Sequence, residues 1–298
     1  MIEIIRLLNE MSPYLLLGFF LAGLMHAFIP AGCYTQHLSR PSFASVWKAA
    51  LFGIPLPLCS CGVIPTAMSL HKEGASKGAV TAFLIATPQT GVDSIFATFS
   101  LMGLPFAIVR PVAALLTSVM GGFWVNVGER KTTDTANRVQ EKSTDASPRS
   151  FAARMKTALN YAFVEMMEDI GKWLVIGMVV AGIITVFVPD SLFDAFRDNT
   201  VASMLLVLVI SVPMYLCATG SIPIAVALMM KGLTPGAALV LLMAGPACNM
   251  ASMLVVRQVL GTRTLVKYIA SIVSGAILFG VVTDLLQANG IVNFTATL

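Results

Sequence analysis

Residues 55–65 read Pro-Leu-Pro-Leu-Cys-Ser-Cys-Gly-Val-Ile-Pro, and they interrupt an apolar segment of the chain. A related stretch, Pro-Met-Tyr-Leu-Cys-Ala-Thr-Gly-Ser-Ile-Pro, occupies residues 213–223, which is 158 positions later (213 − 55). Proline and glycine at these places predict that two helices are broken. Backbone that leaves the helix at membrane depth survives only where protein or a water-filled cavity satisfies its polar groups. Paired breaks in corresponding places point to a transporter's binding site.

The composition is that of a polytopic membrane protein. Hydrophobic residues make up 57% of the chain and charged residues 11%, whereas about a quarter of a soluble domain is charged. The net charge of +4 is spread over loops, with no basic face carrying aromatic residues, so nucleic acid is not an expected partner. Eight hydrophobic segments of roughly bilayer length begin near residues 12, 44, 77, 103, 171, 199, 235 and 265. We read the first as an uncleaved span.

The two halves of the chain repeat each other. When residues 55–88 are placed over 213–246 without a gap, 14 of 34 positions are identical. We therefore predict an all-α membrane protein of two homologous repeats, each with four hydrophobic segments, the second of them broken or re-entrant at the Cys/Pro/Gly loop. Residues 1–128 form the first repeat and 156–298 the second. The polar residues 129–155 read as a disordered cytoplasmic linker.

Each half contains a second predicted break. It reads Thr-Pro-Gln-Thr-Gly at residues 87–91 and Gly-Pro-Ala-Cys-Asn at residues 245–249. Four facing breaks would frame one central cavity. The residues expected to break helices are Pro57, Gly62, Pro65, Pro88, Gly91, Pro213, Gly220, Pro223 and Pro246.

The placement of Lys and Arg favours re-entrant Cys-loop segments over crossing ones. If all eight segments cross, 12 of these residues lie inside and 7 outside. If the Cys-loop segments turn back, the split becomes 15 to 4, in better agreement with the excess of basic residues on the cytoplasmic side. Three crossings per half then make the repeats inverted.

Cys59 and Cys61 flank a serine in the first break, and a short helix is expected to follow them to about Leu70. Helix N-termini favour anions such as thiolates, and thiolates are soft ligands for Cu(I), Zn(II) and other thiophilic centres. A C-x-C pair cannot by itself close a four-ligand structural zinc site, and incomplete coordination suits a carrier that must release its cargo. We favour a thiol contact with substrate at both cysteines, although a structural hairpin and a redox pair remain open.

Other polar and sulfur-bearing residues near the breaks are candidates for lining the same pocket. Cys217 corresponds to Cys59 in the repeat, and Thr219 takes the place of Cys61. The second breaks add four more candidates: Gln89, Thr90, Cys248 and Asn249. Their alternative roles are structural, because small residues pack between membrane helices and polar side chains cap interrupted ones.

Asp93 is the one carboxylate between Gly74 and Gly128. An intramembrane acid is by default a functional residue, often in proton transfer, so Asp93 is the candidate for proton coupling. Its alternative is a first-turn acid on a restarting helix. No nucleotide-binding fingerprint occurs, so a gradient is the expected energy source.

Three blocks of the sequence resemble the ArsP-type predicted permeases, bacterial inner-membrane efflux proteins. They are the Cys-Ser-Cys block at residues 57–65, Lys-Glu-Gly-Ala-Ser-Lys-Gly at 72–78 and Ala-Thr-Pro-Gln-Thr-Gly-Val-Asp at 86–93. The resemblance covers nearly the whole chain apart from the linker. It implies export of trivalent arsenicals, especially organoarsenicals, and hence arsenic resistance. A close subgroup with the same block is assigned to copper or zinc efflux, but its members often carry a His- or Cys-rich tract that this chain lacks.

We therefore expect a multi-pass permease of the bacterial inner membrane rather than an enzyme, with the lipid bilayer and a metal or metalloid substrate as partners. Cys59 and Cys61 would bind the metal or metalloid; no cofactor is expected, and a homo-oligomer stays open. Copper or zinc efflux is the first alternative. A membrane thiol–disulfide relay through Cys59 and Cys217 is the second, and a subunit of a larger membrane complex without cargo of its own is the third.

Overall fold

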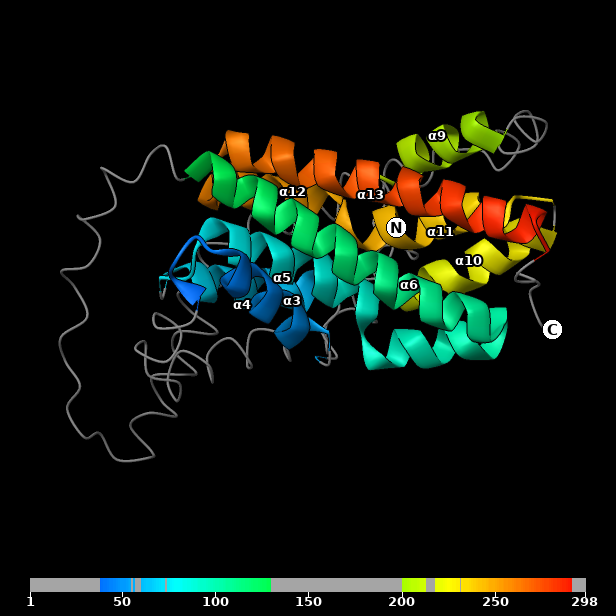
Figure 1. The fold of residues 1–298 in the computed structure, drawn as a ribbon, viewed down its shortest axis with the longest axis horizontal. Helices are drawn as coiled ribbons and strands as arrows, with labels where there is room; N and C mark the ends of the chain where they lie inside the picture. Colours follow the sequence, from blue (N-terminus) through cyan, green and yellow to red (C-terminus); the bar gives the residue numbers. More distant parts are fainter. Residues whose placement is uncertain are drawn as a thin grey trace, which may run out of the picture.

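The computed structural model describes residues 38–54, 56, 60–72, 74–129, 200–212, 218–230 and 232–290. All regular structure in these ranges is helical, in agreement with the predicted fold class (Figure 1). The helices are α3 (Phe43–Gly53), α4 (Ser60–Lys72), α5 (Lys77–Thr90), α6 (Val92–Glu129), α9 (Thr200–Ser211), α10 (Ala218–Met230), α11 (Pro235–Ala247), α12 (Met250–Val259) and α13 (Thr262–Ala288). The predicted linker and the segments that begin near residues 12 and 171 lie outside the described residues.

Helices of the first half have counterparts about 158 residues later. α4 and α10 begin 158 residues apart (218 − 60), and α5 and α11 begin 158 apart (235 − 77). Within α6, Gly103 has a left-handed φ of 80° and bends the helix; in the second half Gly261, with φ of 92°, separates α12 from α13. Glycine is needed at both places because other residues rarely adopt positive φ. α6 therefore corresponds to α12 and α13 together.

Asn126 and Asp284 hold the first turns of two matching helices. The backbone N–H of Gly78 in α5 donates to Asn126 Oδ1 at 3.1 Å. The N–H of Gly236 in α11 donates to Asp284 Oδ1 at 2.6 Å. Both glycines lie against a neighbouring helix so closely that an added Cβ would clash with its backbone. These two contacts, which we call the N-terminal clamps, satisfy backbone donors that a helix leaves free at its start.

α3 and α4 form a hairpin rather than one continuous span. The chain enters before α3 and leaves after α4 at the same place, because the Ser76 N–H donates to the Leu38 carbonyl at 2.9 Å. The turn lies between Ile54 and Ser60. At about 1.5 Å of rise per residue, neither helix is long enough to cross a bilayer core of about 30 Å. This path is the one expected of a re-entrant segment.

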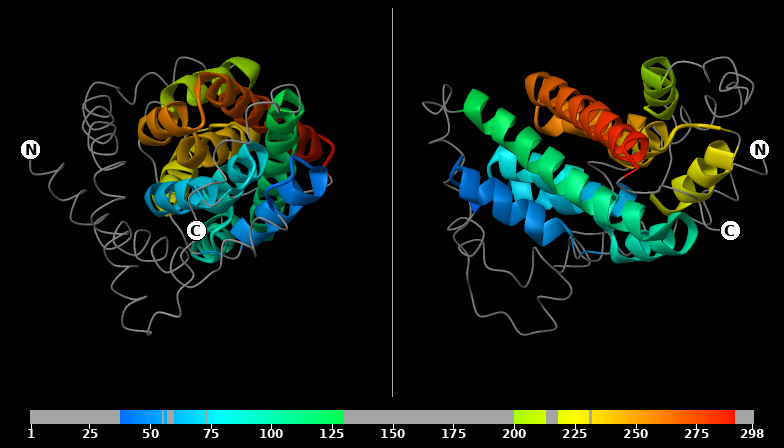
Figure 2. Two further views of the ribbon diagram at one scale, coloured as in Figure 1. Left: turned by 90° about the vertical axis from the view of Figure 1, so that its left-hand side faces the viewer. Right: turned by 45° about the vertical axis from the view of Figure 1, so that its right-hand side comes forward.

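Two long apolar helices pack against the buried helices α5 and α11. Ser94–Gly128 of α6 and Thr262–Ala288 of α13 are long and apolar enough to cross a membrane, and α11 with α12 could form a third, bent span. α6 and α13 lie side by side and run in opposite directions (Figures 1 and 2). They touch where the Thr117 side chain packs on Gly275. These two residues are themselves 158 positions apart (275 − 117), so equivalent points of the two halves meet there.

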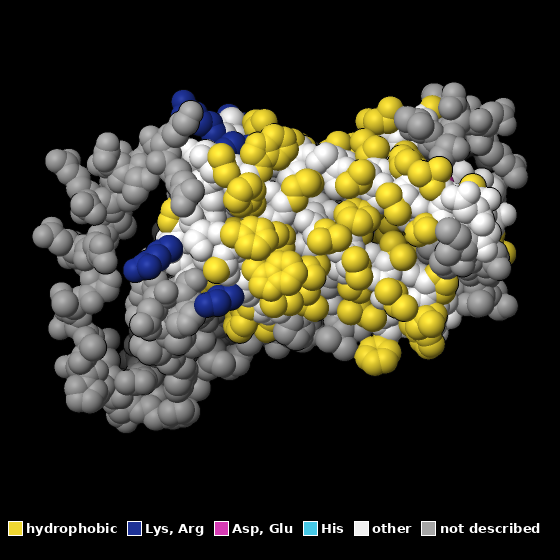
Figure 3. Space-filling view, in the orientation of Figure 1, with side chains coloured by type: hydrophobic (Ala, Val, Ile, Leu, Met, Phe, Trp, Pro, Cys, Tyr) yellow, Lys and Arg dark blue, Asp and Glu magenta, His cyan; other side chains and the backbone are white. Residues whose placement is uncertain are grey.

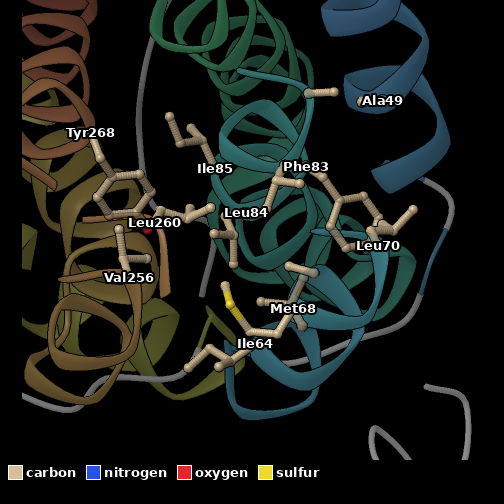
Figure 4. Close-up of a cluster of buried hydrophobic side chains, with 14 of the residues drawn as sticks. Ala49, Ile64, Met68, Leu70, Phe83, Leu84, Ile85, Val256, Leu260 and Tyr268 are labelled. Atoms are coloured by element: carbon tan, nitrogen blue, oxygen red, sulfur yellow. The ribbon is translucent and has the colours of Figure 1, made fainter. Parts of the chain in front are cut away.

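Two large hydrophobic clusters, with a small third one between α3, α5 and α6, form the core of the described helices. The first joins α4 and α5 to the far half through Val256, Leu260 and Tyr268, which face Ile64, Leu84 and Ile85 in Figure 4. The second joins α9, α10 and α11 to residues Met102, Phe106 and Ala113 of α6. Val212, at the end of α9, packs against both clusters. Each half is therefore held partly by helices of the other half.

The outer surface of the described helices is largely apolar. Phe96, Val209 and Met230 are more than 60% exposed, and such side chains form a broad band over the face in Figure 3. On that face Lys and Arg gather at the end where α6 finishes and α13 begins. An apolar band bounded by basic residues is the surface of a protein that sits in a membrane.

The clamps predict that the stability of the fold depends on the hydrogen-bond acceptor at position 284 and not on the negative charge of Asp284. Asp284→Asn should leave the free energy of unfolding in detergent within about 0.5 kcal/mol of the wild type, since Asn126 makes the same contact with an amide. Asp284→Leu should lower it by about 1–3 kcal/mol because the Gly236 N–H loses its acceptor. If the asparagine variant is as unstable as the leucine variant, the charge itself stabilises the fold.

Candidate site at the helix breaks

The structure places part of the predicted site. The segments containing Pro57, Cys59, Pro213 and Cys217 lie outside the described residues. Cys61 and Thr219 belong to the first turns of α4 and α10, and Asp93 to the first turn of α6. For these three only the backbone is described. α4 begins at Ser60, between the two cysteines, so the expected helix N-terminus is present at the Cys-Ser-Cys block.

Most of the expected helix-breaking residues lie inside helices. Gly62 and Pro65 belong to α4, Gly220 and Pro223 to α10, and Pro88 and Pro246 to the last turns of α5 and α11. The helix thus continues through them, since a proline costs one hydrogen bond while neighbouring helices keep the segment in place. The chain leaves the helix at Gly91 in the first half and at Cys248 and Asn249 in the second.

The break at Gly91 leaves buried polar groups without partners. Gln89 is 0% exposed, and neither its Oε1 nor its Nε2 makes a hydrogen bond. Ser94 is 1% exposed, and its Oγ also has no partner. Thr90 differs, because its hydroxyl donates to the Ala86 carbonyl at 2.8 Å within α5. An unpaired buried amide is costly, so the amide of Gln89 has capacity for a further ligand.

The break at Cys248 and Asn249 is internally satisfied. Asn249 Oδ1 accepts from the Ser252 N–H at 2.8 Å and so caps α12. The Ser252 hydroxyl donates to the Ala247 and Asn249 carbonyls at 3.2 and 2.9 Å. The Tyr268 hydroxyl donates to the Ala247 carbonyl as well. Cys248 is fully buried with a free thiol. Asn249 is expected from the sequence to line the pocket, but its side-chain oxygen accepts the hydrogen bond that caps α12.

Sequence reasoning overlooked Arg110. This residue is 1% exposed inside α6, and its Nη1 donates to Thr98 Oγ1 at 2.7 Å. Thr98 in turn donates to the Ser94 carbonyl at 2.7 Å, which joins Arg110 to the first break. Ionisable residues inside a span are functional candidates by default. The signal was present, because Arg110 is the one charged residue between Asp93 and Glu129.

Within the part of the chain that the structure describes, no three His, Cys, Asp or Glu residues come together as a metal site. Of the five cysteines, Cys248 is the one whose side chain the structure describes. Any thiol site at the Cys-Ser-Cys block therefore involves residues beyond those placed here.

The capping contact predicts a structural role for Asn249. Asn249→Ala should lower the free energy of unfolding in detergent by about 1 kcal/mol, because α12 loses its N-cap. Asn249→Ser, which can still accept from the Ser252 N–H and carries no charge, should recover most of the loss. Loss of substrate binding in Asn249→Ala without any change in stability would instead make Asn249 a ligand.

Comparison with known proteins places the chain among membrane permeases. A UPF0718 protein of Methanocaldococcus jannaschii is 24% identical over 94% of this chain and 95% of its own length. A UPF0718 protein of Bacillus subtilis is 25% identical over 72% of each chain. A Streptococcus mutans protein, named as a candidate subunit of a two-component membrane permease complex, is 21% identical over 90% of this chain and 89% of its own.

No solved structure matches the chain significantly. The family model described as "Predicted permease" matches residues 3–285, which is nearly the entire length. The chain therefore belongs to the ArsP-type predicted permease family, whose members are membrane proteins of the transporter class.

Proposed function

We propose that this protein is a multi-pass permease of the bacterial inner membrane that exports a thiophilic metalloid, with trivalent arsenicals and especially organoarsenicals as cargo. The observation that carries the proposal is the path of α3 and α4, which brings the chain back to the place where it entered, with α4 starting at Ser60 within the Cys-Ser-Cys block. A re-entrant turn with two thiols at a helix N-terminus offers soft ligands in a place where membrane carriers bind substrate.

The proposed architecture is two inverted repeats. It is supported by the 158-residue spacing of the helices, by the two clamps at Gly78 and Gly236, and by the antiparallel path of α6 and α13. In an inverted pair, the Thr117–Gly275 contact lies near the bilayer midplane, because equivalent points meet on the symmetry axis. The basic end in Figure 3 would then face the cytoplasm.

Cargo binding in this proposal begins with the thiols of Cys59 and Cys61. Cys217 would approach from the matching segment of the second half, and Thr219, Gln89 and Thr90 would line the pocket, whereas Cys248 is fully buried at the second break. When a thiol binds a hydroxylated trivalent arsenical, the As–S bond replaces an As–O bond and the thiol proton leaves with the hydroxide as water. Binding then releases no net proton, so coupling to a proton gradient needs a separate titratable group. Asp93, in the first turn of α6, is the proposed proton-coupling residue.

Two other cargoes or roles make different demands on the same cysteines. Copper or zinc export would need further soft or imidazole ligands, and the chain has three histidines and no His- or Cys-rich tract. A thiol–disulfide relay would need Cys59 and Cys217 to form a reversible bond across the two halves. Both alternatives are outcomes of the experiment below.

Cells that express the wild type should accumulate less methylarsenite and arsenite than cells without the protein. Cys59→Ser with Cys61→Ser should restore accumulation to the level of the empty control, because an alcohol is a poor ligand for trivalent arsenic. Cys33→Ser, outside both Cys loops, is the matched control and should export normally. Metalloid is measured by mass spectrometry of washed cells at equal protein expression.

Equal export by the double variant and the wild type would contradict the ligand assignment. If the protein lowers cellular copper or zinc and leaves arsenic unchanged, the copper or zinc export alternative is favoured. Reversible crosslinking of Cys59 to Cys217 without any change in cell arsenic would favour the relay.

A further inference from the structure

The two second breaks occupy equivalent positions but differ in how their polar groups are used. Gln89 of α5 corresponds to Ala247 of α11, and Ser94 of α6 corresponds to Ser252 of α12, each 158 residues later. At the second break, Ser252 and its neighbours satisfy one another. At the first break, the side chains of Gln89 and Ser94 make no hydrogen bond.

The unpaired groups at the first break are not explained by capping. Gly91 stands where Asn249 stands in the other half, so no side chain occupies the N-cap position of α6. Thr90 bonds to its own helix. Gln89, at 0% exposure, therefore holds a donor and an acceptor away from water and from protein. Such a group is retained in a fold where it meets a partner that the protein chain does not supply.

Ser94 extends this polar surface along α6. Ser94 and Thr98 lie four residues apart and so share one face of the helix. Thr98 bonds to the Ser94 carbonyl and accepts from Arg110 Nη1. Along the chain, Ser94 thus lies between Gln89, before the break, and the Thr98–Arg110 contact, which begins one turn further on.

We propose that Gln89 and Ser94 form a hydrogen-bonding subsite for the hydroxyl groups of an uncharged solute, and that Asn249, Ser252 and Tyr268 form a fixed joint with no ligand. The identity of the solute rests on the proposed function, in which it is the neutral hydroxylated form of a trivalent arsenical. The chemistry selects hydroxyl groups because Gln89 presents both an acceptor and a donor. A thiophilic metal cation would find only the oxygens of Gln89 and Ser94 here, which are hard ligands that suit it poorly.

Arsenite binding to purified protein in nanodiscs tests the subsite directly. Equilibrium dialysis with metalloid counted by mass spectrometry should show a Kd raised about 10-fold in Gln89→Leu and in Ser94→Ala, which corresponds to the loss of one hydrogen bond. Thermal unfolding without arsenite should show a Tm equal to or above that of the wild type, because an unpaired polar group has been removed. Ser252→Ala is the matched control: its Tm should fall while its Kd stays unchanged.

Two results of that experiment overturn the proposal. One is an unchanged Kd in both Gln89→Leu and Ser94→Ala, as expected if the groups hold an ordered water only. The other is a Tm in Gln89→Leu as low as that of Ser252→Ala, which would make Gln89 a structural residue.

Thiol labelling tests the same subsite without any assumption about cargo. In a background with the native cysteines replaced, Gln89→Cys should react with a small water-soluble thiol reagent in proteoliposomes as the carrier opens. Ala247→Cys, at the matching position of the sealed joint, should stay unreacted. Gel filtration checks that both variants fold.

The two arms separate the failure of the cargo from the failure of the subsite. If the wild type binds no arsenite, the proposed arsenical cargo is wrong, and the labelling experiment decides about the subsite. Reaction at position 89 but not at 247 supports the subsite. Equal reactivity at the two positions overturns it.

Discussion

Hydrocarbon offers no hydrogen-bond partner, and this constraint governs the whole molecule. Each place where the chain stops being a helix exposes backbone donors and acceptors that the protein itself must satisfy. At the start of α5 the side chain of Asn126 accepts a hydrogen bond from the backbone, and at the start of α11 the side chain of Asp284 does so. Gly78 and Gly236 have no side chain, so the neighbouring helix can approach closely. Asn249, Ser252 and Tyr268 satisfy backbone groups at the break before α12. The break at Gly91 differs, because the buried side chains of Gln89 and Ser94 make no hydrogen bond there.

The arrangement of the helices also follows from their lengths. α3 and α4 are too short to cross a bilayer, and the contact between Ser76 and Leu38 brings the chain back to where α3 began. α6 and α13 have the apolar length needed to cross a membrane, and their antiparallel contact joins the two halves. Short helices that turn back are thus combined with long apolar ones.

Much of this organisation could be predicted from the sequence, because repetition and hydropathy are visible in one chain. The 158-residue spacing located the matching helices, and the proline and glycine clusters located the breaks to within a few residues. The prediction that each proline breaks a helix was wrong in detail. α4 continues through Pro65, since one missing hydrogen bond is a small loss beside the packing of a buried helix. Arg110 was visible as a charge within a predicted span, but its burial against Thr98 depends on how α6 bends at Gly103. The same holds for Gln89 and Asn249, two amides at equivalent breaks. Only the neighbours in three dimensions distinguish the one that caps a helix from the one that does not.

The clamps at Asn126 and Asp284 differ in one chemical respect. Their geometry is shared, yet one acceptor is an amide that keeps the same charge at every pH and the other is a carboxylate that can take up a proton. Acidification can therefore act on the clamp at Asp284 and leaves the clamp at Asn126 unchanged. The two matching helix starts thus respond differently to the same change in the surroundings.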